Sequence, residues 1–208
     1  MTGTYPLDPL DFALCGMARD AYAEAPTLVA AGDVHAVVRD IAGMPVVAFR
    51  GTVPLSWADW LRDFASWPHT DRGHPALGRC HDGFLTGALS VFPGLQKLLP
   101  VAMPYAITGH SLGGALAIVT GALMQSIGNP PLRLTTFGAP RVGIGDTLHT
   151  LLGPIAGLRF RRGDDPVPTV PAWPYANDRD WTPVGAAGFP RIEDHMIAGY
   201  LADFSASR

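Results

Sequence analysis

Charged residues are scarce in this sequence, and long apolar runs are absent. Asp, Glu, Lys and Arg make up 16% of the 208 residues, whereas 48% are hydrophobic. No apolar run approaches the roughly 18 residues that a membrane-spanning helix needs, so we expect no transmembrane segment. Asp8 and Asp11 fall where a secretory signal would need an uninterrupted apolar stretch, so no signal peptide is visible. A cytoplasmic location, prior removal of an export segment and export by another route all remain open.

The sequence also lacks an excess of basic residues. Its formal net charge is −3, and the Lys and Arg residues are scattered rather than clustered. A protein that binds nucleic acid has to neutralise phosphates, so we expect no nucleic-acid partner. His69, Asp71, His74, His81 and Asp82 gather in one stretch, but their spacing matches no zinc pattern, so we expect no metal site.

Only two cysteines are present, Cys15 and Cys80. They lie far apart in the sequence and could form one bridge or remain two buried thiols, and their spacing does not decide between the two. The chain length is typical of one α/β domain and is sufficient to bury a sizeable core. We therefore expect residues 1–208 to form a single domain.

Apolar periodicity predicts strands that alternate with helices along most of the chain. The predicted helices span residues 10–23, 84–99, 112–127, 146–152 and a last segment from 193 or 194 to about 204. The predicted strands span residues 35–41, 45–50, 105–108, 132–137 and 158–161. Ala42-Gly43 joins the first two strands as a hairpin, and Pro, Gly and charge in residues 67–79 predict an exposed loop. This alternation predicts an α/β fold with a mostly parallel central sheet flanked by helices on both faces.

A short amphipathic helix is also predicted within residues 56–66. Trp57, Trp60, Leu61 and Phe64 recur at positions i, i+3, i+4 and i+7, with charged residues between them. Such a helix is apolar on one side and polar on the other.

The run Gly109-His110-Ser111-Leu112-Gly113 is a G-x-S-x-G motif between a predicted strand and a predicted helix. In this context the serine lies on a tight, strained turn, and glycines are needed on either side because a Cβ would collide with the strand and the helix. The turn would raise the Ser111 hydroxyl to the top of the sheet and direct the helix N-terminus toward it. We interpret Ser111 as a nucleophile. The alternative is a glycine-rich turn without chemistry.

A serine hydroxyl needs a base within hydrogen-bond reach and a carboxylate that orients this base. On this fold the order along the chain is serine, acid, histidine. Only His149 and His195 follow Ser111, and His149 lies in a predicted helix before any suitable acid, so His195 is favoured. Among the acids between them, only Asp164 and Asp165 directly follow a strand, where the orienting acid belongs. The pattern does not separate this adjacent pair.

Four motifs, in the same order, resemble those of the class 3 (fungal-type) lipases of the α/β-hydrolase superfamily. They are Ala48-Phe49-Arg50-Gly51-Thr52, Gly109-His110-Ser111-Leu112-Gly113-Gly114-Ala115-Leu116-Ala117, Phe137-Gly138-Ala139-Pro140-Arg141-Val142-Gly143 and Asp165-Pro166-Val167-Pro168. The resemblance covers roughly residues 46–200. It implies a single α/β-hydrolase domain that cleaves carboxylic esters of lipids, as a triacylglycerol lipase or carboxylesterase, without a metal or other cofactor.

The resemblance also implies roles for individual residues. Matching the family's motifs assigns the catalytic acid to Asp165 rather than Asp164, and the catalytic histidine to His195. It assigns the oxyanion hole to Leu112, which follows the nucleophile, and to Thr52. Hydrogen-bond donors fixed before the reaction stabilise negative charge as it develops on the carbonyl oxygen.

In the family, the segment corresponding to residues 56–66 is a lid. Trp57, Trp60, Leu61 and Phe64 would cover the site in water and make transient contact with a lipid–water interface, where their burial is favourable. The alternative is a helix that packs permanently on the domain.

Several interpretations remain open. Trp173, Tyr175 and Trp181 either line a pocket for the substrate or anchor a loop. The substrate is a lipid or another small ester. The enzymatic alternative is a non-lipolytic esterase that acts on feruloyl or acetyl esters, and the alternative from another class is a non-catalytic binding domain of the same fold.

Overall fold

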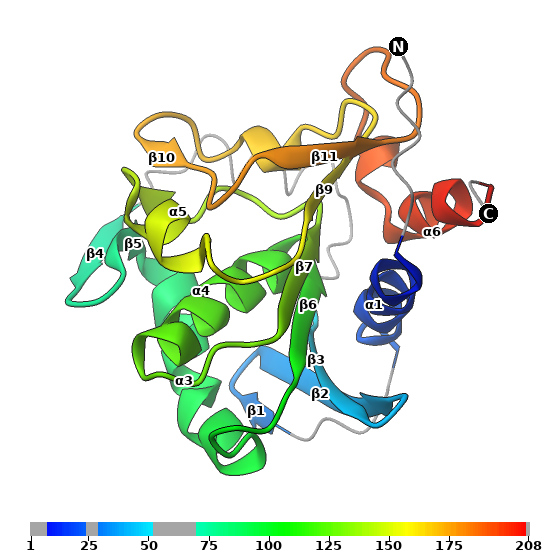
Figure 1. The fold of residues 1–208 in the computed structure, drawn as a ribbon. Coiled ribbons are helices and arrows are strands. Elements are labelled where there is room, and N and C mark those ends of the chain that lie inside the picture. The colour runs from blue at the N-terminus through cyan, green and yellow to red at the C-terminus, as the bar shows by residue number, and fades with distance from the viewer. Residues whose placement is uncertain (1–7, 24–28, 52–69, 207–208) are drawn as a thin grey trace.

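The structure is a computed structural model that describes residues 8–23, 29–51 and 70–206 (Figure 1). Its centre is a seven-stranded sheet with the strand order β1-β2-β3-β6-β7-β9-β11. The strands are β1 (Val29–Ala31), β2 (Val34–Ile41), β3 (Met44–Phe49), β6 (Ala106–His110), β7 (Arg133–Phe137), β9 (Arg159–Arg162) and β11 (Trp181–Val184). From β3 to β11 neighbouring strands are parallel, whereas β1 and β2 are antiparallel to their neighbours. The predicted α/β fold with a mostly parallel sheet is confirmed.

The predicted hairpin forms the start of this sheet. Ile41 pairs with Met44, so Ala42 and Gly43 are the two residues of the turn. Both have positive φ angles, 52° and 85°, as the tightest hairpin turns require. The hairpin thereby brings β3 into the sheet, where it pairs with β6.

Helices cover both faces of the sheet (Figure 1). On one face lie α1 (Pro9–Asp20) and α6 (Ile197–Ala206). On the other lie α3 (Asp82–Leu98), α4 (Leu112–Ser126) and α5 (Thr147–Leu152). The helix α4 is buried from Gly113 to Met124, which explains why its sequence is apolar all round.

The two faces of the sheet have separate hydrophobic cores. Along β3, Val47 and Phe49 pack into the core beneath α3 and α4, whereas Val46 and Ala48 pack into the core beneath α1 and α6. This alternation follows from the two-residue period of a strand. Because both faces are covered, β3 reads as a continuous apolar run.

A buried ion pair holds α1 on the sheet. The Asp11 carboxylate is fully buried and accepts hydrogen bonds from the Arg133 guanidinium at 2.9 and 2.6 Å and from the Thr135 hydroxyl at 2.9 Å. Asp8 caps the N-terminus of the same helix by accepting from the N–H of Leu10. The orientation of α1 matters for the site, because Tyr22 follows directly after this helix.

The prediction of a loop at residues 67–79 is wrong for the part of that segment that the structure describes, from residue 70 onward. Residues 71–74 and 78–81 form β4 (Asp71–His74) and β5 (Gly78–His81), which belong to a second, antiparallel sheet of order β10-β8-β5-β4. The other two strands are β8 (Gly143–Ile144) and β10 (Tyr175–Ala176). Pairing with the distant β8 stabilises β5, and local Pro and Gly content carries no sign of such a partner.

Both cysteines are buried free thiols, so no disulfide joins them. Cys15 packs into the core beneath α1 and α6, and Cys80 packs into the core on the opposite side of the sheet. Within the described residues, no helix is long and apolar enough to cross a membrane.

Candidate active site

Ser111 occupies the turn between β6 and α4. Its φ angle is +58°, and its N–H donates to the carbonyl oxygen of Phe137 at the end of β7. A Cβ at Gly109 would lie 2.3 Å from the carbonyl of Gly113, and a Cβ at Gly113 would lie 2.2 Å from the carbonyl oxygen of Phe49. The two glycines are therefore required by the close approach of strand and helix, as the G-x-S-x-G motif predicts. Among the described residues, the buried Ser111 Oγ has no hydrogen-bond partner.

His195 and Asp165 form a buried pair. Both side chains are fully buried, and His195 Nδ1 lies 2.9 and 3.1 Å from the two carboxylate oxygens of Asp165. A carboxylate accepts hydrogen bonds, so the proton of a neutral imidazole resides on Nδ1. The other nitrogen, Nε2, is then the basic one.

The Asp165 carboxylate receives further hydrogen bonds. The N–H of Val167 donates to Oδ1, and the Tyr200 hydroxyl donates to Oδ2, both at 2.9 Å. Burial, together with the nearby Asp165 charge, raises the pKa of Tyr200 well above its ordinary value, so the hydroxyl keeps its proton. These donors stabilise the ionised carboxylate and fix its direction.

The neighbouring Asp164 points elsewhere. Its carboxylate accepts from the N–H of Gly188 and lies 3.9 Å from the Arg161 guanidinium. The structure therefore brings Asp165, and not Asp164, to His195. This agrees with the assignment that the family resemblance implied, where the pattern of strands alone left the pair open.

All three side chains lie at the carboxyl end of the parallel strands. Ser111 follows β6, Asp165 follows β9, and the rings of His110 and His195 have centroids 4.5 Å apart. His110 immediately precedes Ser111, so the Asp165–His195 pair lies beside the turn that carries the serine. Ligands of open α/β sheets bind at this end of the strands.

The sequence predicted that His195 lies inside the last helix, but the structure places it before that helix. A 3₁₀ turn spans Ile192–His195, and Met196 is extended with ψ of 126° before α6 begins. The prediction of one helix from residue 193 or 194 is therefore wrong at its start. The break lets the His195 ring turn toward Asp165.

Leu112, the first residue of α4, is at the place where a backbone N–H at a helix N-terminus can face the reaction centre. Thr52 lies outside the described residues. Gly51, the last described residue before it, is buried, and a Cβ on it would lie 2.8 Å from the carbonyl oxygen of His110. The segment leading to Thr52 therefore contacts the nucleophile turn. Trp57, Trp60, Leu61 and Phe64 of the predicted lid also lie outside the described residues.

A family model for lipase (class 3) matches residues 46–175 of this sequence. The chain belongs to the class 3 lipase family. Ser111 and Asp165 of this class 3 lipase lie within the matched range, and His195 lies beyond it. The family membership that the motifs suggested is thus confirmed.

Two relatives in this family are secreted fungal lipases. Secreted mono- and diacylglycerol lipase 1 of Fusarium solani is 33% identical over 134 residues, which cover 61% of this chain and 39% of the relative. Secreted mono- and diacylglycerol lipase A of Penicillium cyclopium is 29% identical over 132 residues, covering 61% of this chain and 42% of the relative. This class 3 lipase chain therefore spans about two fifths of the length of these relatives.

Solved structures agree with the fold. Lipase II from Rhizopus niveus superposes with a TM-score of 0.67 at 22% identity, covering 86% of this chain and 80% of that one. A lipase from Rhizopus microsporus var. chinensis gives a TM-score of 0.66 at 23% identity, covering 87% and 75%. The class 3 lipase chain thus has the α/β-hydrolase fold.

The three aromatic residues left open by the sequence differ in environment. Tyr175 is buried in β10, and Trp181 on β11 lies under the Arg161 guanidinium, 4.7 Å from its ring centroid. Trp173 is 89% exposed. Tyr175 and Trp181 therefore pack against neighbouring residues, whereas Trp173 is open to solvent.

Sequence reasoning missed two tyrosines that contact the site. Tyr200 bonds Asp165, and the Tyr22 hydroxyl lies 2.7 Å from His110 Nδ1. Tyr200 lies five residues after His195, within reach of a search of the last helix for donors to the acid. Tyr22 is 88 positions from its partner and belongs to none of the four motifs, so it left no local signal.

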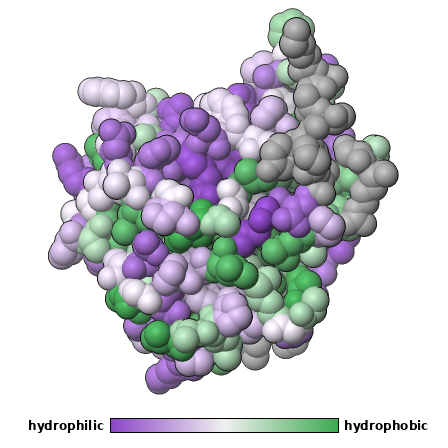
Figure 2. Space-filling view, in the orientation of Figure 1, coloured by the Kyte–Doolittle hydropathy of each residue, from purple (hydrophilic) through white to green (hydrophobic). Residues whose placement is uncertain are grey.

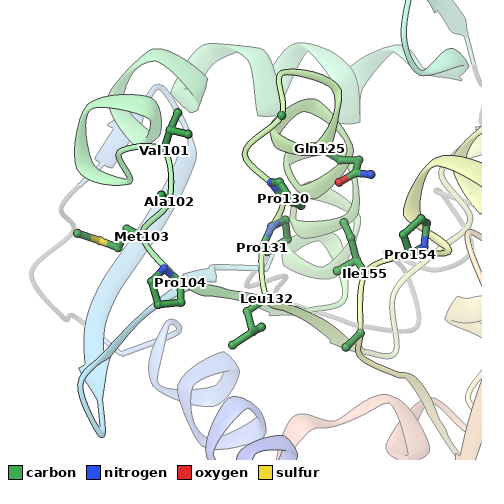
Figure 3. A pocket seen from close by; sticks show the side chains of 12 residues that line it. Val101, Ala102, Met103, Pro104, Gln125, Pro130, Pro131, Leu132, Pro154 and Ile155 are labelled. Carbon is green, nitrogen blue, oxygen red and sulfur yellow. The ribbon is translucent and has the colours of Figure 1, made fainter.

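A groove of about 720 Å³ opens at the other end of the sheet (Figure 3). Its walls are the connections that lead into β6, β7 and β9 at their amino ends. Apolar side chains dominate the lining, among them Val101, Met103, Pro104, Pro131, Leu132 and Ile155. Ser111 and Asp165 lie at the carboxyl ends of these strands, so the groove is not part of their site.

Among the described residues, no group of His, Cys, Asp and Glu is arranged to hold a metal ion.

Proposed function

We propose that this chain hydrolyses carboxylic esters of lipids through an acyl-enzyme formed on Ser111. The observation that carries the proposal is the buried Asp165–His195 pair, 2.9 Å between Oδ2 and Nδ1, beside the strained turn of Ser111. This arrangement, with the base oriented by a carboxylate and the serine raised at the strand ends, is the one that nucleophilic acyl transfer requires.

In the proposed reaction, His195 Nε2 accepts the hydroxyl proton while Ser111 Oγ attacks the ester carbonyl carbon. Negative charge develops on the carbonyl oxygen, and the N–H of Leu112 together with Thr52 would stabilise it. His195 then gives the proton to the leaving alcohol, and the acyl group stays on Ser111. Water, deprotonated by His195, attacks this ester and releases the carboxylic acid with regeneration of the serine.

Lipid esters are the proposed substrate class for two reasons. The fungal relatives are named as mono- and diacylglycerol lipases. In addition, the two most exposed large hydrophobic side chains among the described residues are aromatic, Trp173 at 89% and Phe189 at 80%. Phe189 follows Gly188, whose N–H donates to the carboxylate of Asp164, the residue before Asp165. Elsewhere, on the face shown in Figure 2, hydrophobic residues lie in small patches between hydrophilic ones. Exposed aromatics near a site favour contact with a lipid–water interface.

A panel of esters tests the proposal. We expect purified protein to hydrolyse p-nitrophenyl butyrate and a tributyrin emulsion, and a fluorophosphonate to label Ser111 stoichiometrically. Hydrolysis confined to acetyl or feruloyl esters would favour the non-lipolytic esterase instead. A folded protein that neither turns over any ester nor takes up the probe would refute the proposal and favour a binding domain.

Replacement of Gly138 by alanine should lower turnover by about 10²-fold, because misplacing catalytic groups by about 1 Å has an effect of that size. Gly138 has a φ of +55°, and a Cβ there would lie 2.7 Å from Asp165 Oδ2 and 2.9 Å from His195 Nδ1. The new methyl group would therefore separate the pair. Turnover of p-nitrophenyl butyrate per folded molecule is the measurement.

Gly128→Ala is the matched control for this variant. Gly128 also has a positive φ, +76°, but a Cβ there meets no atom within 4 Å. It introduces similar backbone strain without a collision. Equal activity of the two variants would contradict the role of the Gly138 contact.

A further inference from the structure

A chain of three groups links the end of α1 to the backbone of the histidine proposed as the base. The Tyr22 hydroxyl lies 2.7 Å from His110 Nδ1, and His110 Nε2 lies 2.6 Å from the carbonyl oxygen of His195. We call this the Tyr22–His110–His195 chain. It joins the residue next to the nucleophile to the main chain of the residue proposed as its base.

The chemistry of the groups fixes the direction of both hydrogen bonds. A carbonyl oxygen only accepts, so His110 Nε2 must carry a proton and donate it to His195. Burial, with the nearby His195 ring as a second cause, lowers the pKa of His110 well below its ordinary value, so the imidazole is neutral. Its Nδ1 is therefore an acceptor, and the Tyr22 hydroxyl donates to it. Tyr22 thus holds His110 in the tautomer that bonds His195.

The backbone of His195 needs such support because the secondary structure around it is short. His195 ends a four-residue 3₁₀ turn, and the extended Met196 separates this turn from α6. Arg162 holds the outer side of the turn, where its guanidinium donates to the carbonyl oxygen of Glu193 and to the Asp194 carboxylate. On the inner side, His110 is the group that bonds the His195 carbonyl.

Tyr22 also lies against the segment that leads to the proposed oxyanion hole. A Cβ on Gly51 would lie 2.0 Å from the Tyr22 hydroxyl oxygen, so this hydroxyl occupies the space that any other residue at position 51 would need. Thr52 is the next residue. One hydroxyl group therefore lies between the end of β3 and the turn of the nucleophile.

We propose that His110 and Tyr22 are positioning residues, which hold the His195 imidazole in register with Ser111 through the backbone of His195. This inference rests on the proposed ester hydrolysis. It assigns neither residue a contact with substrate, so their loss should reduce kcat while leaving KM nearly unchanged.

Three variants and one control test the proposal. His110→Met removes the Nε2 donor but keeps a side chain of similar length, and His110→Gln keeps an N–H near the Nε2 position. Tyr22→Phe deletes one hydroxyl group. The control is Tyr105→Phe, because Tyr105 is also buried and its hydroxyl also bonds a neighbour, the carbonyl oxygen of Asn129, at the amino end of β6 far from the site.

Fluorophosphonate titration counts active sites, and turnover of p-nitrophenyl butyrate is expressed per titrated site. We expect His110→Met to lower kcat per site by about 10- to 100-fold with KM within about twofold. We expect His110→Gln to recover most of this loss and Tyr22→Phe to lower kcat by about 3- to 10-fold, the worth of one hydrogen bond. Tyr105→Phe should lower the melting temperature and leave kcat per site unchanged.

A purely structural role predicts another result. The variants would then lose titratable sites or melting temperature while each remaining site turned over as in the wild type, and this would overturn the inference. If His110→Met does not fold, Tyr22→Phe and His110→Gln still distinguish a positioning role from a structural one. Each of these variants keeps a side chain similar in size to the original. Wild-type protein that is folded but neither labelled nor active would refute the proposed hydrolysis, and the positioning role with it.

Discussion

Replacement of Ser111 by alanine is expected to lower ester hydrolysis by about 10⁵- to 10⁶-fold. The remaining groups can still bind an ester, but the acyl-enzyme has no oxygen on which to form. In serine hydrolases the members of the triad act as a unit, and loss of the nucleophile alone costs about as much as loss of all of them. The measurement is single-turnover and steady-state hydrolysis of p-nitrophenyl butyrate.

The fold should survive this change. Alanine at position 111 takes the same φ of +58° as serine, and among the described residues Ser111 Oγ makes no hydrogen bond that would be lost. Ser126→Ala is the matched control, since that hydroxyl bonds the Leu123 carbonyl at the far end of α4. Retained hydrolysis and labelling in Ser111→Ala, beyond contamination, would show that another residue is the nucleophile.

Asp165→Asn is expected to lower kcat by about 10⁴-fold, the size of effect known for loss of the orienting carboxylate. An amide presents an N–H where the carboxylate presented an acceptor, so the His195 proton is driven from Nδ1 to Nε2. The imidazole then faces the serine with a donor and no longer acts as a base. The Tyr200 hydroxyl and the Val167 N–H, which both donate to Asp165, add to the mismatch.

Asp164→Asn provides the comparison in the adjacent residue. Its carboxylate accepts from the Gly188 N–H, a bond that an asparagine oxygen also makes, whereas the carboxylate beside His195 Nδ1 is that of Asp165. We expect turnover within about threefold of the wild type, because a surface change of this kind costs little. Equal losses in the two variants would contradict the assignment of the acid to Asp165.

Local signals predicted the part of the site that is local. The turn of Ser111 was recognisable because a Cβ on Gly109 would collide with Gly113 inside the same motif, although the demand on Gly113 itself comes from the distant Phe49. The hairpin of β2 and β3 was recognisable in the same way from Ala42 and Gly43, whose φ angles are both positive. In these elements, residues that favour the turn lie within the turn or next to it in the sequence.

Elements that depend on distant partners were not predictable in this way. The strand β5 pairs with β4 just before it and with β8 more than 60 positions later, whereas the composition of residues 67–79 resembles a loop. The choice between Asp164 and Asp165 depends on how the strand end directs each side chain, which a pattern of strands does not encode. Tyr22 reaches His110 across 88 positions because the Asp11–Arg133 ion pair fixes α1 on the sheet.

The position of the two cysteines gives each face of the sheet its own chemical reporter. Cys15 is enclosed on the side of α1 and α6, and Cys80 on the side of α3 and α4. Burial raises the pKa of both thiols, that of Cys80 to about 11, so neither is a reactive thiolate while the layers are closed. Modification of either thiol therefore requires local opening of the helices that cover its face of the sheet. The modification rates of Cys15 and Cys80 thus measure separately how often each of the two cores opens.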